Sequence, residues 1–536
     1  MIQTPAPADS DADAHARVDA DSGAALAQGL RHWLQAPGDA PVQMVQTHIS
    51  RILLTRDFAY KLKKPLRLPF ADFSTPALRR HYCNEELRLN LRLAPTLYLD
   101  VLPVLGSPAQ PRLGTSQDVD AAIDWVLRMR RFATGSELDA LVRAGALAPA
   151  EVDAFAARLA RFHSEVSAAP EGADWGTAAQ VAQAIHGVMD TLAPLLPAPD
   201  APRLTMLRAW FDARQPTLAD DWTARRAAGH VREGHGDLHL ANLVRLAGEV
   251  TAFDCIEFSP ALRWIDTLAD AGFFTMDLHA HGRADLAWRF LDAYLAGTGD
   301  YAGLAVLRPY EVYRALVRAM AARLRAGQGA EALPVQGPDY LGCAETLAAP
   351  LRPRLLITHG LSGSGKSTVA AALLQHGAVR LRSDVERKRL HGLAPLDKSA
   401  AHGLDIYTPE ATRRTFDHLH SQARAALQAG YPVIVDAAFL RRHERDAFRA
   451  LAGALGLPFT ILHCHADPRQ LQERVQRRSA AGTDPSEAGA AVLALQQTSA
   501  EPLAADELAH ALSLVTDQPW DAGDLYRRWM ASPSKA

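Results

Sequence analysis

The sequence is poor in cysteine and lacks long apolar runs, and both absences narrow the kind of protein that it encodes. Only four cysteines occur in 536 residues, and they lie far apart without paired spacing: Cys83, Cys255, Cys343 and Cys464. This distribution argues against a disulfide framework or a zinc site and favours a reducing cytoplasm. No run approaches the roughly 18 apolar residues of a membrane-spanning helix, and the N-terminal segment lacks the basic start and apolar core of a secretory signal. We therefore expect a cytoplasmic protein without a membrane span.

A basic excess is also missing. The 57 lysine and arginine residues are balanced by 60 aspartate and glutamate residues, which gives a formal net charge of −3. Proteins that bind nucleic acid or anionic membranes usually carry a basic excess, so neither is expected as a partner. With 48% hydrophobic and 22% charged residues, the composition is that of a globular protein. The chain is too long for one hydrophobic core, and roughly two to four domains are expected.

The clearest chemical signal in the first half is residues 235–242, His-Gly-Asp-Leu-His-Leu-Ala-Asn. Asp237 is followed by Asn242 at the spacing of the kinase catalytic loop, in which the aspartate accepts the proton of the attacking hydroxyl and the asparagine binds magnesium. Twelve positions later, Asp254 follows the apolar run 250–253 and can supply the second metal-binding side chain. The pattern predicts a phosphotransfer site with Asp237 as base and with Asn242 and Asp254 as metal ligands.

A kinase also needs a lysine that holds the α and β phosphates and a glutamate that orients the lysine. Residues 42–64 predict a β-hairpin, and its last strand places Lys61 and Lys63 on one face. Either lysine can serve. The following helix, predicted over 75–93, offers Glu85 or Glu86, and the spacing of its apolar residues does not choose between them.

The phosphate-covering loop of kinases has no glycine-rich counterpart here. Residues 47–50, Thr-His-Ile-Ser, stand where that loop would precede the lysine strand. Phosphate cover in this half must then come from hydroxyl groups and other backbone amides.

With His-Gly-Asp in place of His-Arg-Asp, this half resembles the aminoglycoside phosphotransferase and choline kinase branch of the kinase fold. The resemblance favours Glu86 as the partner of the lysine. It also implies that residues 121–131 form a strand and hinge into a helical lobe, and that Asp266 supports the catalytic loop, although a salt bridge at a helix start would explain Asp266 nearly as well.

A second nucleotide site is predicted after residue 353. Residues 354–360 form a buried strand-like run, and residues 360–367 fit Gly-x4-Gly-Lys-Ser in full before a helical stretch. In such a loop, backbone N–H groups surround a phosphate at a helix N-terminus, the lysine reaches the β and γ phosphates, and the serine binds magnesium. The expected nucleotide-binding residues are Gly360, Leu361, Ser362, Gly363, Ser364, Gly365, Lys366, Ser367 and Thr368.

Three further features select among P-loop proteins. Asp384 ends the next strand-like run and lies where small-molecule kinases of this fold place the acid that contacts the acceptor hydroxyl. Asp436 ends the apolar run 431–436 and can hold a magnesium-bound water or contact the substrate. Arg474 and Arg478 lie on a predicted helix. They match the lid arginines of these kinases, which neutralise the phosphoryl group in transit, or they form part of a solvated face.

The order of the two sites resembles a bacterial family of bifunctional aminoglycoside phosphotransferase/ATP-binding proteins, in which a kinase-like domain precedes a P-loop kinase-type domain. The resemblance implies two sites for ATP and Mg2+ and leaves the substrate open. We predict a disordered tail over 1–24, an α+β kinase-like domain over 25–348, and a three-layer α/β P-loop domain over 349–536. The expected function is ATP-dependent phosphorylation of small-molecule hydroxyl groups. Two alternatives are a P-loop module that only regulates the first kinase, and a first domain that only binds a ligand.

Overall fold

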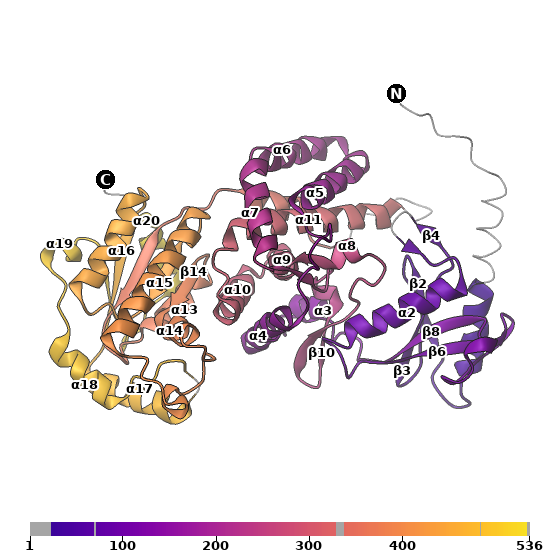
Figure 1. Ribbon diagram of the computed structural model, residues 1–536, viewed down its shortest axis with the longest axis horizontal. Helices are drawn as coiled ribbons and strands as arrows, with labels where there is room; N and C mark the ends of the chain where they lie inside the picture. Colours follow the sequence, from indigo (N-terminus) through magenta and orange to yellow (C-terminus); the bar gives the residue numbers. More distant parts are fainter. Residues whose placement is uncertain (1–22, 69–70, 328–336, 483, 533–536) are drawn as a thin grey trace. The chain divides into compact units, whose positions relative to one another are not determined.

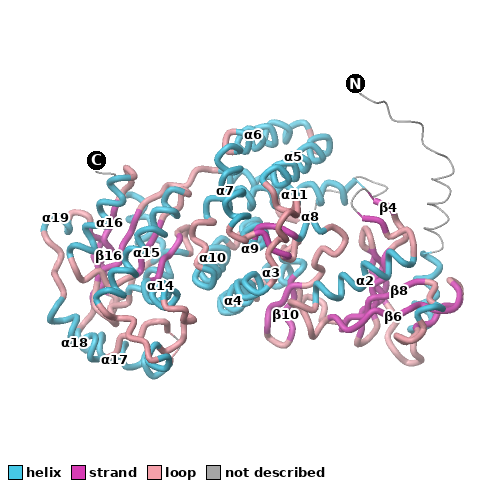
Figure 2. Tube along the Cα trace, in the orientation of Figure 1, coloured by secondary structure: helices cyan, strands magenta, loops and turns pink. Residues whose placement is uncertain are grey.

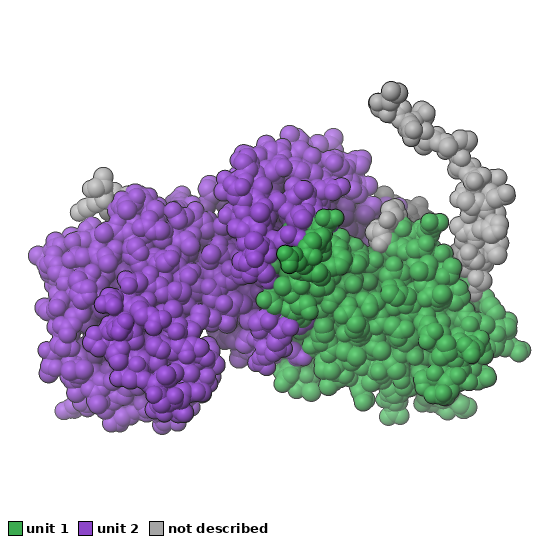
Figure 3. Space-filling model, in the orientation of Figure 1, with its two compact units in different colours: residues 1–146, 166–176, 231–266 green, residues 147–165, 177–230, 267–536 purple. Residues whose placement is uncertain are grey.

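The computed structural model describes residues 23–68, 71–327, 337–482 and 484–532 (Figure 1). Most of the predicted N-terminal tail therefore lies outside the described residues. The chain divides into two compact units (Figure 3). Unit 1 comprises residues 1–146, 166–176 and 231–266, and unit 2 comprises residues 147–165, 177–230 and 267–536. The predicted boundary at residue 348 is not one of these divisions and stays a prediction.

Unit 1 is built on a six-stranded antiparallel sheet with the strand order β1-β2-β3-β8-β6-β7. The strands are β1 (Gln43–Gln46), β2 (Ser50–Leu54), β3 (Phe58–Lys63), β6 (Tyr98–Ser107), β7 (Gln110–Leu113) and β8 (Asp124–Arg130). The predicted hairpin over 42–64 is confirmed as the meander β1-β2-β3. The strand expected within residues 121–131 is β8, which lies in the middle of the sheet.

Two helices cover the two faces of this sheet. Residues 23–34 are helical, and Leu26 and Leu30 pack with Tyr60 and Leu62 of β3 on one face. Helix α2 (Pro76–Asn90) is capped by the Thr75 side chain and buries Cys83 against the other face. Because side chains alternate along a strand, the same pleat that turns Tyr60 and Leu62 toward one helix turns the two lysines of β3 toward α2.

The rest of unit 1 consists of short elements that follow the sheet. They are β4 (Arg67–Leu68), β5 (Ala71–Asp72), α3 (Leu138–Arg143), β9 (Val231–Glu233), β10 (Leu243–Leu246), β11 (Glu249–Ala252), α8 (Pro260–Arg263) and β12 (Trp264–Asp266). β10 and β11 form an antiparallel hairpin, and β12 pairs with β9. Residues 235–242 therefore lie between the β9–β12 pair and the β10–β11 hairpin, with Asp254 directly after the hairpin.

Unit 2 begins with helices, which Figure 2 shows in cyan. They are α4 (Pro149–Glu165), α5 (Ala178–Leu192), α6 (Ala201–Asp212), α7 (Gln215–Ala227), α9 (Thr267–Ala280), α10 (Ala284–Thr298), α11 (Leu304–Gly327) and α12 (Tyr340–Ala348). Helix α9 is buried around nearly its whole circumference, with α10 and α11 packed against it. None of the helices in the described part of the chain is both long and apolar enough to cross a membrane.

The last part of unit 2 is a parallel five-stranded sheet with the order β14-β15-β13-β16-β17. Its strands are β13 (Leu355–His359), β14 (Val379–Arg382), β15 (Val433–Asp436), β16 (Phe459–His465) and β17 (Ala511–Val515). Its helices are α13 (Lys366–Leu374), α14 (Ser383–Leu390), α15 (Pro409–Gln428), α16 (Arg442–Ala454), α17 (Pro468–Ala481), α18 (Ala490–Ser499), α19 (Ala505–Leu508) and α20 (Ala522–Ala531).

Helices cover both faces of this sheet, as a three-layer fold requires (Figure 1). Helices α13 and α20 pack together on one face, where Val369 and Trp529 join a core with Leu356 and Ile434 of the strands. Helices α15 and α16 contact the strands as well. The carboxyl ends of β13, β14 and β15 meet at one edge, which is where parallel α/β sheets bind ligands.

An ion pair joins α10 to this sheet within unit 2. Arg380 of β14 donates from Nη2 to Asp292 Oδ2 of α10 at 2.7 Å and from Nε to Asp292 Oδ1 at 3.1 Å. The same guanidinium donates from Nη1 to the carbonyl oxygen of Ser367 at 3.3 Å. Both side chains are at most 13% exposed, so this arginine connects a helix outside the sheet to the loop that begins α13.

Asp292→Ala should destabilise unit 2, because it leaves the buried Arg380 guanidinium without its carboxylate partner. Breaking one side of a buried pair typically costs about 3–5 kcal/mol of unfolding free energy, and urea unfolding of the full chain measures that loss. Asp285→Ala on the same helix is the matched control, since its pair with Arg283 is exposed and should contribute about 1 kcal/mol or less. Equal losses for the two variants would contradict a structural role for the Arg380–Asp292 pair.

Candidate active sites

The first candidate site is assembled around Lys61 of β3, within unit 1. Lys61 Nζ lies 2.7 Å from Glu86 Oε1 of α2 and 2.5 Å from Asp254 Oδ1. Glu86 is fully buried, whereas the Asp254 side chain is 44% exposed. The lysine therefore links an interior carboxylate to one that solvent can reach, and Glu85 takes no part because its carboxylate pairs with Arg88.

Lys63 lies deeper in the same face of the sheet. Its Nζ is 2.7 Å from Glu86 Oε2 and also contacts Glu257 Oε1, and both partners are buried. Burial alone would raise the pKa of Glu86, but Lys61 and Lys63 bring it down to about 2. Burial alone would likewise lower the pKa of Lys61, yet Asp254 and Glu86 hold it well above its ordinary value. Glu86, Lys61 and Lys63 therefore remain charged at neutral pH.

The catalytic-loop motif places Asp237 beside Asn242. Asn242 Nδ2 donates to Asp237 Oδ2 at 2.9 Å and to the Asp237 carbonyl oxygen at 3.0 Å, and His239 Nε2 lies 3.4 Å from Asp237 Oδ2. Gly236 has φ +90°, and a Cβ there would lie 2.6 Å from the carbonyl oxygen of Leu262. The turn that presents Asp237 therefore requires glycine at the preceding position.

Asp254 is held in the left-handed region, with φ +62°. Its backbone N–H donates to the Tyr98 hydroxyl at 3.0 Å. A non-glycine residue at positive φ is uncommon and is typical of functional sites. Tyr98 thus helps to fix a backbone geometry that turns the Asp254 carboxylate toward Lys61.

The oxygen atoms of this site suit Mg2+, which favours carboxylate and amide oxygens together with water. Asn242 uses its Nδ2 on Asp237, so its side-chain oxygen is the atom available to a cation. Asp254 offers a partly exposed carboxylate. Within the described residues, no group of three or more His, Cys, Asp or Glu side chains could hold a metal ion, so any magnesium here would keep several water ligands.

Residues 47–50, which stand where kinases have a glycine-rich loop over the phosphates, form a closed turn between β1 and β2. The Thr47 hydroxyl accepts from Ser50 N–H at 3.0 Å, and Lys64 Nζ donates to the Thr47 carbonyl oxygen at 2.6 Å. These bonds close the turn between β1 and β2. The Thr47 hydroxyl is therefore engaged in its own turn.

The second candidate site is the loop between β13 and α13 in unit 2. Gly363 has φ +83°, and a Cβ there would lie 2.6 Å from the carbonyl oxygen of Leu471. Helix α13 begins at Lys366, so the N–H groups of its first turn lack partners within the helix and face the loop, as in an anion site. Lys366 Nζ donates to the carbonyl oxygens of Gly360 and Leu361 at 2.8 Å each. Burial lowers the pKa of Lys366, although Asp436 opposes the shift.

Asp436 ends β15 at the same edge of the sheet, as predicted. The Asp436 side chain is 3% exposed, and its Oδ2 accepts no hydrogen bond from the described residues, with Arg380 Nη1 at 3.9 Å. A buried carboxylate oxygen without a donor fits a hydrated cation. Ser367 lies at the start of α13 on the same edge, so Ser367 and Asp436 could together hold magnesium.

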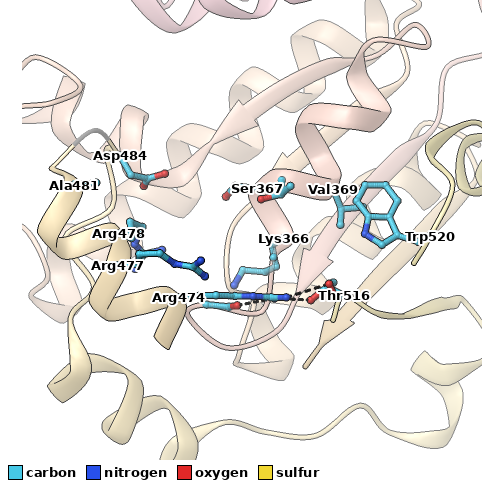
Figure 4. A pocket seen from close by; sticks show the side chains of 13 residues that line it. Lys366, Ser367, Val369, Arg474, Arg477, Arg478, Ala481, Asp484, Thr516 and Trp520 are labelled. Atoms are coloured by element: carbon cyan, nitrogen blue, oxygen red, sulfur yellow. Dashed lines mark hydrogen bonds between the residues drawn. The ribbon is translucent and has the colours of Figure 1, made fainter. Parts of the chain in front are cut away.

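Two cavities meet at Lys366 and Ser367. The larger, about 530 Å³, is bounded by the loop, by three arginines of α17 and by Trp520 (Figure 4). The smaller, about 280 Å³, extends from Lys366 past Asp384 and Asp436 to α18. A phosphoryl donor in the first cavity and an acceptor in the second would meet beside Lys366.

The arginines of α17 differ in their surroundings. Arg474 donates to Thr516 Oγ1 at 2.9 Å and to the Gly363 carbonyl oxygen at 3.3 Å, which ties the loop to the end of β17. Arg478 donates to the Ala488 carbonyl oxygen at 2.7 Å and borders both cavities. Figure 4 also shows Arg477 beside Arg478 at the rim of the larger cavity, although it is absent from the predicted site residues.

Asp384 borders the smaller cavity, but the strand that was expected to end at this residue is shorter. β14 ends at Arg382, and Asp384 lies in the first turn of α14. The helix starts early because Ser383 directly follows the strand and the next residues favour a helix. Sequence reasoning also missed Arg387, one turn further along α14, which borders the same cavity. Its i+3 spacing from Asp384 was the signal that could have identified it.

Comparisons with known proteins agree with this architecture. The AAA domain family (AAA_33) matches residues 355–503. An uncharacterized protein of Mycobacterium tuberculosis (strain H37Rv) is 28% identical over 502 residues, which are 92% of this chain and 96% of that protein. A gluconokinase of Gluconobacter oxydans is 32% identical over 130 residues, which are 24% of this chain and 67% of that enzyme. A solved choline/ethanolamine kinase family protein from Mesorhizobium loti covers 60% of this chain and 92% of its own, with 13% identity and a TM-score of 0.35.

The predicted architecture is confirmed: an α+β part precedes a three-layer α/β P-loop part. The expectation of a kinase is confirmed as well. Residues 355–503 therefore match the AAA domain family, and this part of the chain is a P-loop domain of the kinase type.

Proposed function

We propose that the protein is a magnesium-dependent phosphotransferase with two catalytic sites, each of which transfers the γ-phosphate of ATP to a hydroxyl group of a small molecule. The observation that carries this proposal is that each site has its own lysine and its own aspartate at the motif positions that kinases use for phosphate binding and for the base. Unit 1 combines Lys61 with Asp237, and the P-loop part combines Lys366 with Asp384. This organisation is that of the bifunctional aminoglycoside phosphotransferase/ATP-binding proteins.

In the first site, Asp237 accepts the proton of the acceptor hydroxyl as the hydroxyl oxygen attacks the γ-phosphorus. The bond between that phosphorus and the β–γ bridging oxygen breaks, and ADP leaves. Asn242 holds the Asp237 carboxylate in place through its Nδ2. Lys61, oriented by Glu86, binds the α and β phosphates. Magnesium held by Asn242 and Asp254 would neutralise charge on the phosphates.

In the second site, Asp384 has the role of the base and Lys366 that of the phosphate-binding cation. Backbone N–H groups of residues 363 and 365–368, which border the larger cavity, surround the phosphates. Arg478, which borders both cavities, is placed to neutralise the phosphoryl group in transit. Ser367 and Asp436 would hold magnesium. Trp520 offers the nucleotide base an aromatic surface at the far end of the larger cavity (Figure 4).

Of the two lysines on β3, we assign phosphate binding to Lys61, because it contacts the partly exposed Asp254, whereas both partners of Lys63 are buried. Lys61→Ala in a Lys366→Ala background should weaken magnesium-nucleotide binding to unit 1 about ten- to a hundredfold, the effect of one charge-assisted contact. Lys63→Ala should instead lower the unfolding free energy by about 3–5 kcal/mol, because it leaves Glu257 without its cation. Calorimetric titration and urea unfolding would distinguish the two variants. The reverse pattern would assign the phosphates to Lys63.

The role of Asp237 can be tested in the full chain with Lys366→Ala silencing the P-loop site. Asp237→Asn should lower kcat about a hundred- to ten-thousandfold, the usual contribution of a general base, while leaving nucleotide binding largely intact. Asp254→Ala should weaken magnesium-nucleotide binding instead. Asp57→Asn, in an exposed turn of the same unit, is the control. Full transfer activity in Asp237→Asn, measured with radiolabelled ATP and a metabolite extract as acceptor source, would exclude Asp237 as the base.

Asp384 is tested in the reciprocal background, with Asp237→Asn silencing the first site. Asp384→Asn should remove transfer to a hydroxyl acceptor with little change in ATP affinity, because Asp384 borders the acceptor cavity and is absent from the lining of the nucleotide cavity. Asp417→Asn on the exposed side of α15 is the control. Loss of ATP binding in Asp384→Asn would show that this residue is a metal ligand or a structural residue.

A further inference from the structure

The smaller cavity of the P-loop part is lined by an excess of positive charge. Five cationic side chains border it, against three carboxyl groups. The cations are Lys366, Arg382, Arg387, Arg441 and Arg478, and the carboxyl groups are Asp384, Asp436 and Glu444. Its volume of about 280 Å³ is near the lower end for small-molecule sites, which span roughly 300–1,000 Å³. The cavity therefore suits a small, polar and anionic compound.

Arg387 is the most deeply placed of the cations that a nucleotide would not reach. It is 6% exposed. Nη1 donates to the Ile406 carbonyl oxygen at 2.8 Å and to Thr412 Oγ1 at 3.1 Å, and the buried Nε has no hydrogen-bond partner among the described residues. None of these acceptors is charged. Burial also lowers the pKa of Arg387, against an opposing effect of Asp384.

Other buried arginines of the same domain are compensated differently. Arg445 forms a two-pronged pair with Glu507, at 2.6 and 3.0 Å, and Arg380 forms one with Asp292. A guanidinium keeps its charge at any pH that a protein tolerates. Burying that charge beside neutral acceptors alone is costly. A buried cation that borders an open cavity and lacks a carboxylate partner is expected where a ligand supplies the negative charge.

The negative charge that Arg387 lacks is not supplied by an ion pair with another side chain of the cavity in the described part of the chain. Arg382 and Arg441 lie near Asp484 and Glu501 at 3.7 and 3.4 Å, so they are partly neutralised already. The ring of Tyr407 lies 5.0 Å from the Arg387 guanidinium and covers one of its sides. Asp384 and Glu444 interact electrostatically with Arg387, but neither carboxylate forms an ion pair with it within 4.0 Å in the described part of the chain.

We infer that the acceptor of the P-loop domain is a small hydroxy compound with a carboxylate or phosphate group, and that Arg387 binds this group while Asp384 faces the hydroxyl. The inference rests on the proposed kinase function of this domain. Asp384 and Arg387 are three residues apart on α14, so their side chains leave the same face of the helix about 5–6 Å apart. The anionic group and the reacting hydroxyl must therefore lie within one short molecule.

The test uses the full chain carrying Asp237→Asn and four probes: D-gluconate with a carboxylate, D-glucose 6-phosphate with a phosphate, neutral D-glucitol and cationic ethanolamine. Transfer from γ-labelled ATP is measured, and probe binding is measured by calorimetry with a saturating non-hydrolysable ATP analogue and Mg2+. We expect transfer to one of the two anionic probes, and which one identifies the anionic group. Arg387→Gln should raise the KM for that probe about ten- to a hundredfold without changing the KM for ATP.

Two further variants keep the test decisive. Arg387→Lys, which retains the charge, should recover part of the affinity. Arg413→Gln, an exposed arginine on α15, should leave both KM values unchanged. Thermal unfolding shows whether each variant is folded, and the preference among probes in the parent chain needs no variant at Arg387.

The outcomes separate the inference from the function on which it rests. Lys366-dependent transfer to D-glucitol or ethanolamine, insensitive to Arg387→Gln, would overturn the anionic acceptor and leave the kinase intact. Arg387-dependent binding of an anionic probe without transfer to any probe would support the anion site and count against the kinase. Absence of both binding and transfer of the anionic probes would overturn the inference.

Discussion

Each half of the chain buries a lysine ammonium group, and the need to compensate that charge organises the residues around it. In unit 1, Lys61 is compensated by carboxylates from α2 and from the segment after β11, so three stretches far apart in sequence are held together by one cation. In the P-loop, the hydrogen-bond partners of Lys366 among the described residues are carbonyl oxygens, and burial lowers the pKa of this lysine. The phosphates of a nucleotide would supply the missing negative charge in the second case and compete with Asp254 in the first.

The arginines of the P-loop part follow the same rule. Arg380 is neutralised by Asp292 of α10 and also reaches the Ser367 carbonyl oxygen at the start of α13. A helix that precedes the P-loop sheet by many residues therefore contributes to the shape of the nucleotide loop. This explains why contacts group α10 with the P-loop part, although the sequence places this helix in the kinase-like half.

The sequence was sufficient to predict the placement of a site residue where that placement depends on local spacing. The Gly-x4-Gly-Lys-Ser loop, the Asp237–Asn242 interval and the strand-end position of Asp436 each depend on neighbours within a few residues, and the structure places them accordingly. Lys61 and Lys63 share a strand face, so spacing could not separate them. The positions of Asp254, 193 residues away from Lys61, and of Glu257, beside Lys63, distinguish their surroundings. Arg387 was missed for a related reason, because its lack of a carboxylate partner depends on how α14, α15 and the intervening loop pack.

The central claim is that the chain has two independent nucleotide sites, one built on Lys61 and one on Lys366. Calorimetric titration of the full chain with a non-hydrolysable ATP analogue and Mg2+ tests it most directly. The account predicts two nucleotides bound per wild-type chain and one per Lys366→Ala chain, because it assigns Lys366 to the nucleotide bound at the P-loop alone. A single site in the wild type that vanishes in Lys366→Ala would show that unit 1 does not bind nucleotide by itself, and would contradict the account.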